Sequence, residues 1–229
     1  MLRAMVPDPK QSAGAGATAA AMQADPQARL AARIAACTAC AGRFAATRSG
    51  HAPRPVARLS ATAKVLLAGQ APGARVHASG IPFDDASGDR LRGWMGVDRD
   101  TFYDASRLAI LPMAFCFPGY DAKGADLPPP PLCADLWRAE AMEAMPQLEL
   151  IVLIGAHAQR WHLGGPARAM TAAVADWRAS LCARPALLPL PHPSWRNTGW
   201  LKRNPWFEAE VTPWLRAALR PLLAQPEPC

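Results

Sequence analysis

Four short apolar runs, each stopped by a loop of small or polar residues, constrain the fold of this chain more than any other feature. They span residues 64–68, 108–111, 148–154 and 186–190, and each runs directly into glycine or proline. A continuous apolar run of this length, without alternating polar residues, is typical of a β-strand that helices cover on both faces. The sequence therefore predicts a buried sheet of four strands.

Helical segments alternate with these runs along the chain. Apolar spacing and composition indicate helices at 26–41, 88–95, 133–145, 156–163, 170–179 and 206–223. Such alternation is typical of a parallel sheet. We expect one three-layer α/β/α domain over residues 26–224, with a central, mainly parallel four-stranded sheet. Residues 1–25 and 225–229 are expected to form tails, and the proline-rich segment 118–132 a stiff extended connection.

Composition limits the class of protein. The chain has 229 residues, 51% of them hydrophobic, which suits a single core. The lack of an apolar run of about eighteen residues predicts no membrane span. The absence of a leucine-rich signal core predicts a cytoplasmic protein. The formal net charge of +7 favours a polyanionic partner such as DNA or RNA. We expect a monomer without a nucleotide cofactor.

Two of the loops that follow strands carry groups suited to a site. In open α/β sheets, ligands bind outside the carboxyl ends of the strands. The loop after the first strand consists of Gly69, Gln70, Ala71, Pro72 and Gly73. The loop after the fourth strand contains His192 and Ser194. The sequence therefore predicts an active site between these two loops.

The motifs resemble, in order, those of the uracil-DNA glycosylase superfamily, most closely its bacterial and archaeal iron–sulfur branch. They read Gly-Gln-Ala-Pro-Gly at 69–73, Gly-Ile-Pro-Phe at 80–83, Ser-Gly-Asp-Arg-Leu at 87–91 and His-Pro-Ser at 192–194. The resemblance covers roughly residues 34–223. It implies a monofunctional glycosylase that flips a damaged base out of single- or double-stranded DNA and hydrolyses its N-glycosidic bond during base-excision repair.

The cysteines extend the resemblance. The iron–sulfur branch holds a four-iron, four-sulfur cluster with a Cys-x-x-Cys pair, a cysteine after the second strand and another opening a helix. Cys37, Cys40, Cys116 and Cys133 occupy these positions, and they imply the same cluster here. The alternatives are a zinc site built from the same ligands or four unrelated buried thiols.

The resemblance also assigns roles around the flipped base. Phe83 matches the aromatic residue that stacks on the base, and His192 the donor that stabilises the anion developing on it. His77, beside an acidic position of the branch, is a further candidate to contact the base. The alternative for Phe83 is a core position, and for His192 an ordinary loop position.

The first loop departs from the known patterns. Gln70 stands where the iron–sulfur branch has glutamate, and it can position water or the base but cannot act as a general base. Ala71 stands where the best-known uracil glycosylases have a catalytic aspartate. Asp84 and Asp85 are the nearest candidates for the missing carboxylate, with Asp85 preferred. The alternative is that they only cap the following helix.

Two further features bear on the substrate. Pro112 stands where the branch reads uracil with an asparagine, so base recognition must use other groups: the backbone near 113–115, Asp84 or Gln70. A segment rich in cationic, polar and aromatic residues follows His192 and suits contacts with DNA phosphates and a wedge into the base stack. Its expected contact residues are Ser194, Arg196, Asn197, Lys202 and Arg203. The alternative is a tryptophan-rich packing contact.

We therefore expect a DNA glycosylase that removes uracil, the product of cytosine deamination. One rival is a glycosylase for another lesion, such as hypoxanthine or xanthine, because Pro112 removes the usual reader. The other rival is a DNA-binding protein that keeps the fold but lacks catalysis, because fold does not determine function.

Overall fold

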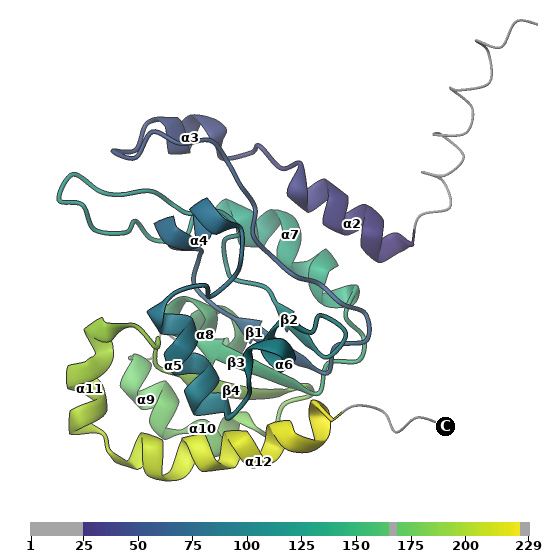
Figure 1. Cartoon of the computed structure of the whole chain (residues 1–229), viewed down its shortest axis with the longest axis vertical. Coiled ribbons are helices and arrows are strands. Elements are labelled where there is room, and N and C mark those ends of the chain that lie inside the picture. The colour runs from purple at the N-terminus through teal and green to yellow at the C-terminus, as the bar shows by residue number, and fades with distance from the viewer. Residues whose placement is uncertain (1–24, 165–168, 225–229) are drawn as a thin grey trace, which may run out of the picture.

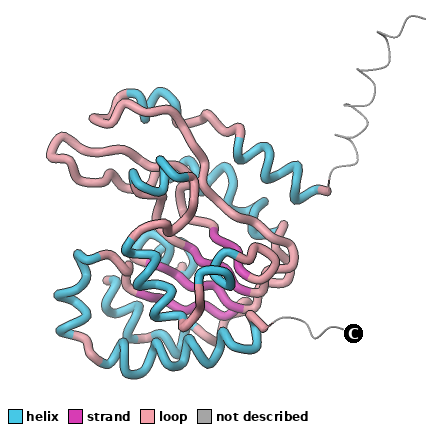
Figure 2. Tube along the Cα trace, in the orientation of Figure 1, coloured by secondary structure: helices cyan, strands magenta, loops and turns pink. Residues whose placement is uncertain are grey.

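The computed structural model describes residues 25–164 and 169–224. At its centre is a sheet of parallel strands in the order β2-β1-β3-β4 (Figures 1 and 2). The strands are β1 (Val65–Ala68), β2 (Leu108–Ile110), β3 (Leu150–Ile154) and β4 (Ala186–Leu190). The predicted α/β/α class and parallel sheet are confirmed. The tails expected at 1–24 and 225–229 lie outside the described residues.

Helices cover both faces of the sheet. One face packs against α5 (Ala86–Met95), α6 (Arg99–Tyr103), α9 (Met170–Ala175), α10 (Trp177–Ser180), α11 (Thr198–Arg203), the π-helical turn η2 (Phe207–Val211) and α12 (Thr212–Leu222). The other packs against α2 (Pro26–Ala35), α7 (Pro131–Glu143) and α8 (Ala156–Leu163). Because side chains alternate along a strand, Val65 and Leu67 face the first layer and Leu66 and Ala68 the second.

The helix boundaries differ from the sequence predictions in several places. The first helix ends at Ala35, and a separate short helix, α3 (Ala41–Ala45), follows the segment that contains Cys37 and Cys40. The helix predicted over 170–179 is divided into α9 and α10, and the one over 206–223 begins with the π-helical turn. Three short helices were not predicted: α4 (Ala74–Ser79), α6 and α11.

The connection between β2 and α7 is not one stiff extended segment. Tyr120 and Asp126 form an antiparallel bridge, and the Asp121 carboxylate accepts hydrogen bonds from two backbone N–H groups in the turn between them. The last of the four consecutive prolines, Pro131, opens α7, where its missing N–H costs no helical hydrogen bond. The hairpin at 120–126 therefore projects from the domain as a loop beside α3 and α4 (Figure 1).

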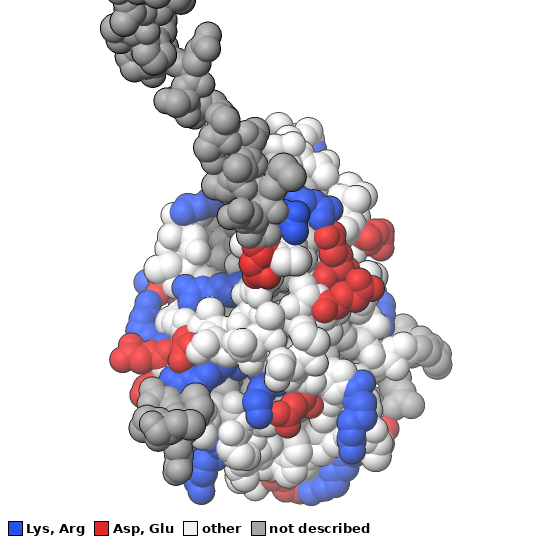
Figure 3. All heavy atoms as spheres, turned by 90° about the vertical axis from the view of Figure 1, so that its right-hand side faces the viewer, with Lys and Arg blue, Asp and Glu red and all other residues white. Residues whose placement is uncertain are grey.

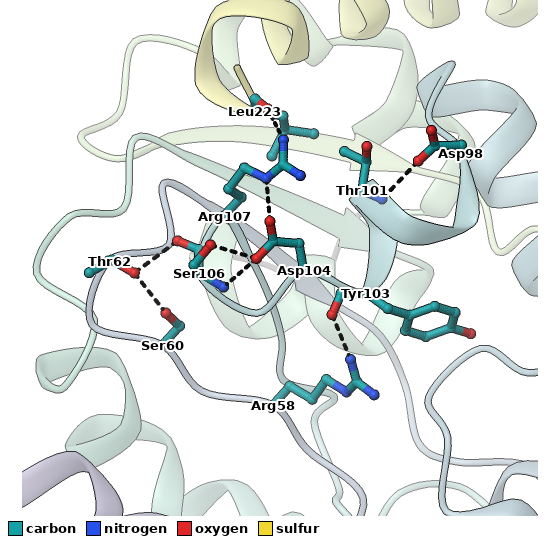
Figure 4. Close-up of polar contacts among 10 residues, drawn as sticks. All are labelled: Arg58, Ser60, Thr62, Asp98, Thr101, Tyr103, Asp104, Ser106, Arg107 and Leu223. Atoms are coloured by element: carbon teal, nitrogen blue, oxygen red, sulfur yellow. Dashed lines mark hydrogen bonds and ion pairs between the residues drawn. The ribbon is translucent and has the colours of Figure 1, made fainter. Parts of the chain in front are cut away.

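A polar network fixes the amino end of β2 (Figure 4). The Asp104 carboxylate accepts hydrogen bonds from Ser106 and from Arg107 Nε, and these bonds hold the pKa of Asp104 below its usual range. Arg107 also donates to the Leu223 carbonyl at 2.7 Å, which ties β2 to the end of α12. This network lies at the opposite end of the sheet from the two predicted loops, so its role is structural.

No helix in the described part of the chain is both long and apolar enough to cross a bilayer. Basic and acidic side chains are interspersed on the face shown in Figure 3. The net positive charge therefore does not form one continuous basic field on that face.

Candidate active site

A pocket of about 550 Å³ opens at the carboxyl ends of the strands. Both predicted loops line it, together with the segment around Phe83 and the hairpin 120–126. In the strand order β2-β1-β3-β4, β1 connects to β2 on one side while β3 lies on its other side, which makes the boundary between β1 and β3 the topological switch point. Ligands of doubly wound sheets bind at such points. The predicted site residues in its wall are Gly69, Gln70, Ala71, Pro72, Phe83, Asp85, His192, Ser194, Arg196 and Asn197.

Backbone hydrogen bonds hold the first loop in place. The N–H of Met113 donates to the Gly69 carbonyl at 2.9 Å, and the N–H of Ala114 donates to the Gln70 carbonyl at 3.1 Å. The residues after β2 thereby fix the loop after β1. The Gln70 side chain is half-buried in the pocket wall, where its amide can contact a base or a water molecule.

Phe83 adopts a backbone conformation that side chains rarely take. It has a φ of 55°, the only positive φ among the described non-glycine residues. Its ring meets Phe102 edge to face, and a Cβ placed on Gly69 would lie 3.4 Å from the ring. The Tyr103 hydroxyl donates to the Pro82 carbonyl at 2.8 Å and helps to hold this turn. Strained conformations persist where the surroundings enforce them, often at functional sites. Here the strain places an aromatic ring in the pocket wall.

Gly88 allows this turn to pack against α5. A Cβ on Gly88 would lie 1.8 Å from the Phe83 carbonyl oxygen, a separation that no pair of nonbonded atoms can adopt. The Gly88 N–H donates to Asp85 Oδ1 at 2.9 Å. The stacking ring and the start of α5 are therefore fixed relative to each other by one glycine and one carboxylate.

The two aspartates after Phe83 lie in different environments. Asp85 caps α5 and also lines the pocket. Asp84 forms an ion pair with Arg99 at 3.1 Å and does not line the pocket. Asp85 thus combines the capping and pocket positions that the sequence left as alternatives, and it is the better placed of the two to act on a substrate.

His192 is held as a neutral hydrogen-bond donor. The N–H of Ser194 donates to His192 Nδ1 at 3.2 Å, so in the neutral ring the proton resides on Nε2. Burial lowers the pKa of His192, although the negative charge of Asp85 partly opposes the shift. Gly155 packs beside His192, and its φ of 83° favours glycine there, whereas a Cβ would make only an ordinary contact with His192 Cβ at 3.5 Å. The ring can therefore donate to a ligand without carrying a charge.

The segment after His192 forms one side of the pocket mouth. Asn197 donates to the His192 carbonyl at 2.7 Å, and Arg90 donates to the Ser194 carbonyl at 3.1 Å. Arg196 lies 3.5 Å from Asp126 of the hairpin, so an ion pair joins opposite walls of the pocket. The side chains of Lys202 and Arg203 are exposed on α11 and do not line the pocket.

Asp126 and Trp195 are among the pocket residues that were absent from the sequence-based site. Asp126 lies in the irregular hairpin, where no periodicity or motif marks it, and its negative charge raises the pKa of His192. Trp195, at the pocket mouth, is 76% exposed, the highest exposure among the large described hydrophobic side chains. Its place directly after the His-Pro-Ser motif could have identified it.

His77 lies apart from the pocket lining. Its ring contacts His51 and Phe117, and burial lowers its pKa. The structure therefore places His77 in an aromatic cluster rather than among the residues that would contact a base.

The backbone near 113–115 offers no free amide donor to read a base. The N–H groups of Met113 and Ala114 bind the first loop, and that of Phe115 donates to Cys133 Sγ at 3.3 Å. Pro112 itself lines the pocket. Recognition of a base edge is therefore left to side chains such as Gln70 and Asp85 and to the remaining backbone groups of the loops.

The four cysteines at the predicted positions share one small cavity. Cys37, Cys40, Cys116 and Cys133 line a space of about 20 Å³ between α3, α7 and the residues after β2. A backbone N–H group donates to one of the sulfurs, from Phe115 to Cys133 Sγ at 3.3 Å. Burial raises the pKa of Cys116 to about 12 and that of Cys133 to about 11, so both are neutral thiols while no metal binds.

In the described part of the chain, no three His, Cys, Asp or Glu side chains converge closely enough to hold a metal ion. A tetrahedral zinc site requires four sulfurs at about 2.3 Å from one point. The thiolates of a four-iron cluster bind separate iron atoms at its corners and need no common point. Four cysteines around one cavity have the donor chemistry of thiolate ligation.

A comparison with protein families gives an independent result. The family model described as the uracil DNA glycosylase superfamily matches residues 56–216. The match spans the sheet, both pocket loops and the hairpin 120–126.

Proposed function

Because this chain belongs to the uracil DNA glycosylase superfamily, we propose that it removes uracil from DNA at the pocket between the two loops. Membership indicates a DNA glycosylase that hydrolyses N-glycosidic bonds, and the proposal adds the base and the residues. The observation that carries it is His192, which is held with its proton on Nε2 in a pocket that also contains the Phe83 ring.

The pocket groups suit the charges that develop during the reaction. When the glycosidic bond breaks, its electron pair remains on the base and positive charge develops at C1′ of the sugar. The Nε2–H of His192 would donate to the base oxygen that becomes negative, while the Phe83 ring stacks on the base. The Asp85 carboxylate would stabilise the sugar cation. Water then adds its oxygen to C1′ and releases a proton, with Gln70 positioned to orient it.

A second substrate class has its own support. Pro112 supplies no side-chain hydrogen bond, and the neighbouring amides are occupied, so the pocket lacks the usual reader of uracil. A site without a dedicated hydrogen bond to one base discriminates weakly against bases that lack the matching group. Excision of hypoxanthine or xanthine is therefore the alternative activity.

An oligonucleotide assay tests the proposal. Duplex and single-stranded DNA containing one uracil, hypoxanthine or xanthine is incubated with the full chain, and abasic sites are cleaved and counted. We expect abasic sites at uracil and none in undamaged DNA. Excision of only hypoxanthine or xanthine would favour the alternative activity. Salt-dependent DNA binding without excision of any lesion would indicate a non-catalytic binder.

We further propose that Cys37, Cys40, Cys116 and Cys133 hold a four-iron, four-sulfur cluster. The support is their shared cavity, the N–H···S hydrogen bond to Cys133 and the chemistry of four thiol ligands. When bound, the cluster would cross-link α3, α7 and the segment after β2. Iron and sulfide analysis of anaerobically purified protein tests this assignment, and protein without iron would contradict it.

Trp195 is expected to act as the wedge that helps to expel the base. Its exposed ring at the pocket mouth can occupy the space that the flipped base leaves, and such stacking contributes about 1–3 kcal/mol. We expect Trp195→Ala to lower kcat/KM on duplex DNA about tenfold. On single-stranded DNA, where the base is already unpaired, the loss should be much smaller.

Trp161 provides the matched control for this measurement. It is 46% exposed on α8 and does not line the pocket. Trp161→Ala should excise bases from both substrates at the wild-type rate. Equal losses on duplex and single-stranded DNA for Trp195→Ala would contradict the wedge role.

A further inference from the structure

Arg138 is the most deeply buried cation in the described part of the chain. It lies in α7, and only 1% of its surface is exposed. Its Nη1 donates to the carbonyls of Leu111 and Pro112 at 2.7 and 3.1 Å, and its Nη2 lies 2.6 Å from His162 Nε2. These partners are all uncharged acceptors: two are carbonyls, and burial together with the adjacent guanidinium lowers the pKa of His162 to about 3.

The positive charge of Arg138 lacks a carboxylate partner. The ion pairs found among the described residues engage other arginines and a lysine, and the Nε–H of Arg138 has no hydrogen-bond acceptor there. A buried charge without an opposite charge is strongly destabilising, because the interior solvates it poorly. Arg92, the other buried arginine, is paired with Asp89 at 2.6 Å. The environment of Arg138 therefore calls for an anion that these side chains do not supply.

The cysteine cavity lies where such an anion would act. Cys133 is in the same helix as Arg138, and its Sγ accepts a hydrogen bond from the Phe115 N–H at 3.3 Å, just after the two carbonyls that Arg138 binds. The carbonyls that Arg138 binds begin the segment that continues to Cys116, another of the cavity cysteines. Four thiolates around a doubly charged metal group carry a net charge of −2, which follows from the charges of the ligands and the metal.

We propose that Arg138 is the counter-ion of a metal-loaded four-cysteine site and stabilises the bound form through its charge. The inference rests on the proposed cofactor and goes beyond it, because it assigns a role to a residue outside the ligand set. The same guanidinium holds the Leu111 and Pro112 carbonyls, and Pro112 lines the base pocket. Arg138 is therefore a positioning residue that connects the cysteine site with the wall of the active site.

Two variants of Arg138 separate its charge from its packing. Arg138→Met removes the charge and keeps a long side chain, whereas Arg138→Lys keeps the charge and loses the planar fork. The full chain is purified anaerobically and challenged with a chelator, and the loss of iron–sulfur absorbance is followed with time. Replacement of groups outside the ligand set typically costs about 10–100-fold in metal affinity. We expect metal loss at least about tenfold faster from Arg138→Met and near the wild-type rate from Arg138→Lys.

The reduction potential of the cluster gives a readout that packing alone would not shift. Reduction adds a negative charge, which a nearby cation stabilises, so Arg138→Met should have a more negative potential than wild type and Arg138→Lys should not. Arg92→Met is the control, because it removes a buried arginine from α5, in the opposite helical layer. It should retain the wild-type potential and chelator resistance even if it is less stable.

The outcomes distinguish the two proposals. If wild type contains iron and Arg138→Met matches it in chelator resistance and potential, the counter-ion role is wrong and the cofactor stands. If anaerobically purified wild type contains no iron, both are wrong. Base excision by wild type is measured in a separate assay. Neither the iron content nor the Arg138 variants test the proposed glycosylase activity. If Arg138→Met does not fold, the test uses Arg138→Lys, which keeps the positive charge. A reduction potential of Arg138→Lys that is as negative as expected after the loss of a full charge would contradict the counter-ion role.

Discussion

Replacing His192 with alanine is expected to lower kcat for base excision by about 10²–10³-fold. The imidazole would donate to negative charge that develops in the transition state, so its loss should affect kcat more than substrate binding. Single-turnover excision kinetics and DNA-binding affinity, measured on the same lesion-containing oligonucleotide, test this. His192→Gln should retain part of the activity, because an amide N–H can also donate.

The pH dependence provides a second test of the same residue. Burial lowers the pKa of His192, so the ring stays neutral as the pH falls through 6.5, the ordinary value for histidine. Wild-type excision attributable to His192 should therefore persist at that pH and decline only at the lowered pKa, where protonation of Nδ1 removes the acceptor of the Ser194 N–H that holds the ring.

Activity of His192→Ala within about threefold of wild type would rule out this role, since one transition-state donor contributes far more.

Gly88→Ala is expected to destabilise the folded protein more than any other small substitution in α5. The added Cβ would meet the Phe83 carbonyl at 1.8 Å, so the Phe83 turn or the first turn of α5 must move. Overlap with backbone cannot be relieved by a side-chain rotation. We expect a loss of about 3 kcal/mol or more in the free energy of unfolding. Any folded fraction should bind uracil-containing DNA normally but excise slowly, because the stacking ring is displaced.

Gly93 offers a control in the same helix. A Cβ on Gly93 would have no described atom within 4 Å, and the backbone there is helical. Gly93→Ala should leave activity unchanged and stabilise the protein by about 0.5–1 kcal/mol, because alanine favours helix over glycine. Urea unfolding of both variants provides the comparison. Equal stabilities for Gly88→Ala and wild type would mean that the turn adapts without cost.

The strands could be predicted from sequence because each is a buried apolar run that ends at glycine or proline. Such a run can be recognised from the local sequence alone, because a strand that is covered on both faces needs apolar residues throughout. Helices α4, α6 and α11 were missed because they have six residues or fewer. A helix of that length shows less than two turns of periodicity, and its ends rather than its pattern determine it.

Site residues could be predicted from sequence where motifs directly follow strands. They could not be predicted where tertiary contacts determine which side chains reach the pocket. The motifs locate Phe83 and His192 and favour Asp85 over Asp84, but only the fold pairs Asp84 with Arg99 and places Asp85 in the pocket wall. Asp126 reaches the pocket through a hairpin in a segment whose prolines predicted an extended chain. The tautomer of His192 depends on one backbone N–H, which only the folded loop positions.

The position of β4 has a consequence for protein synthesis. It is the last strand of the chain, and it joins the sheet at an edge beside β3, carrying the His192 loop to a pocket whose first wall follows β1. Contacts between segments so distant in the chain form late, because the closure of long loops is entropically costly. A nascent chain that has exposed only β1 to β3 can fold part of its core, yet it lacks the loop that completes the pocket. Base excision at this pocket would thus become possible only when the fold is complete.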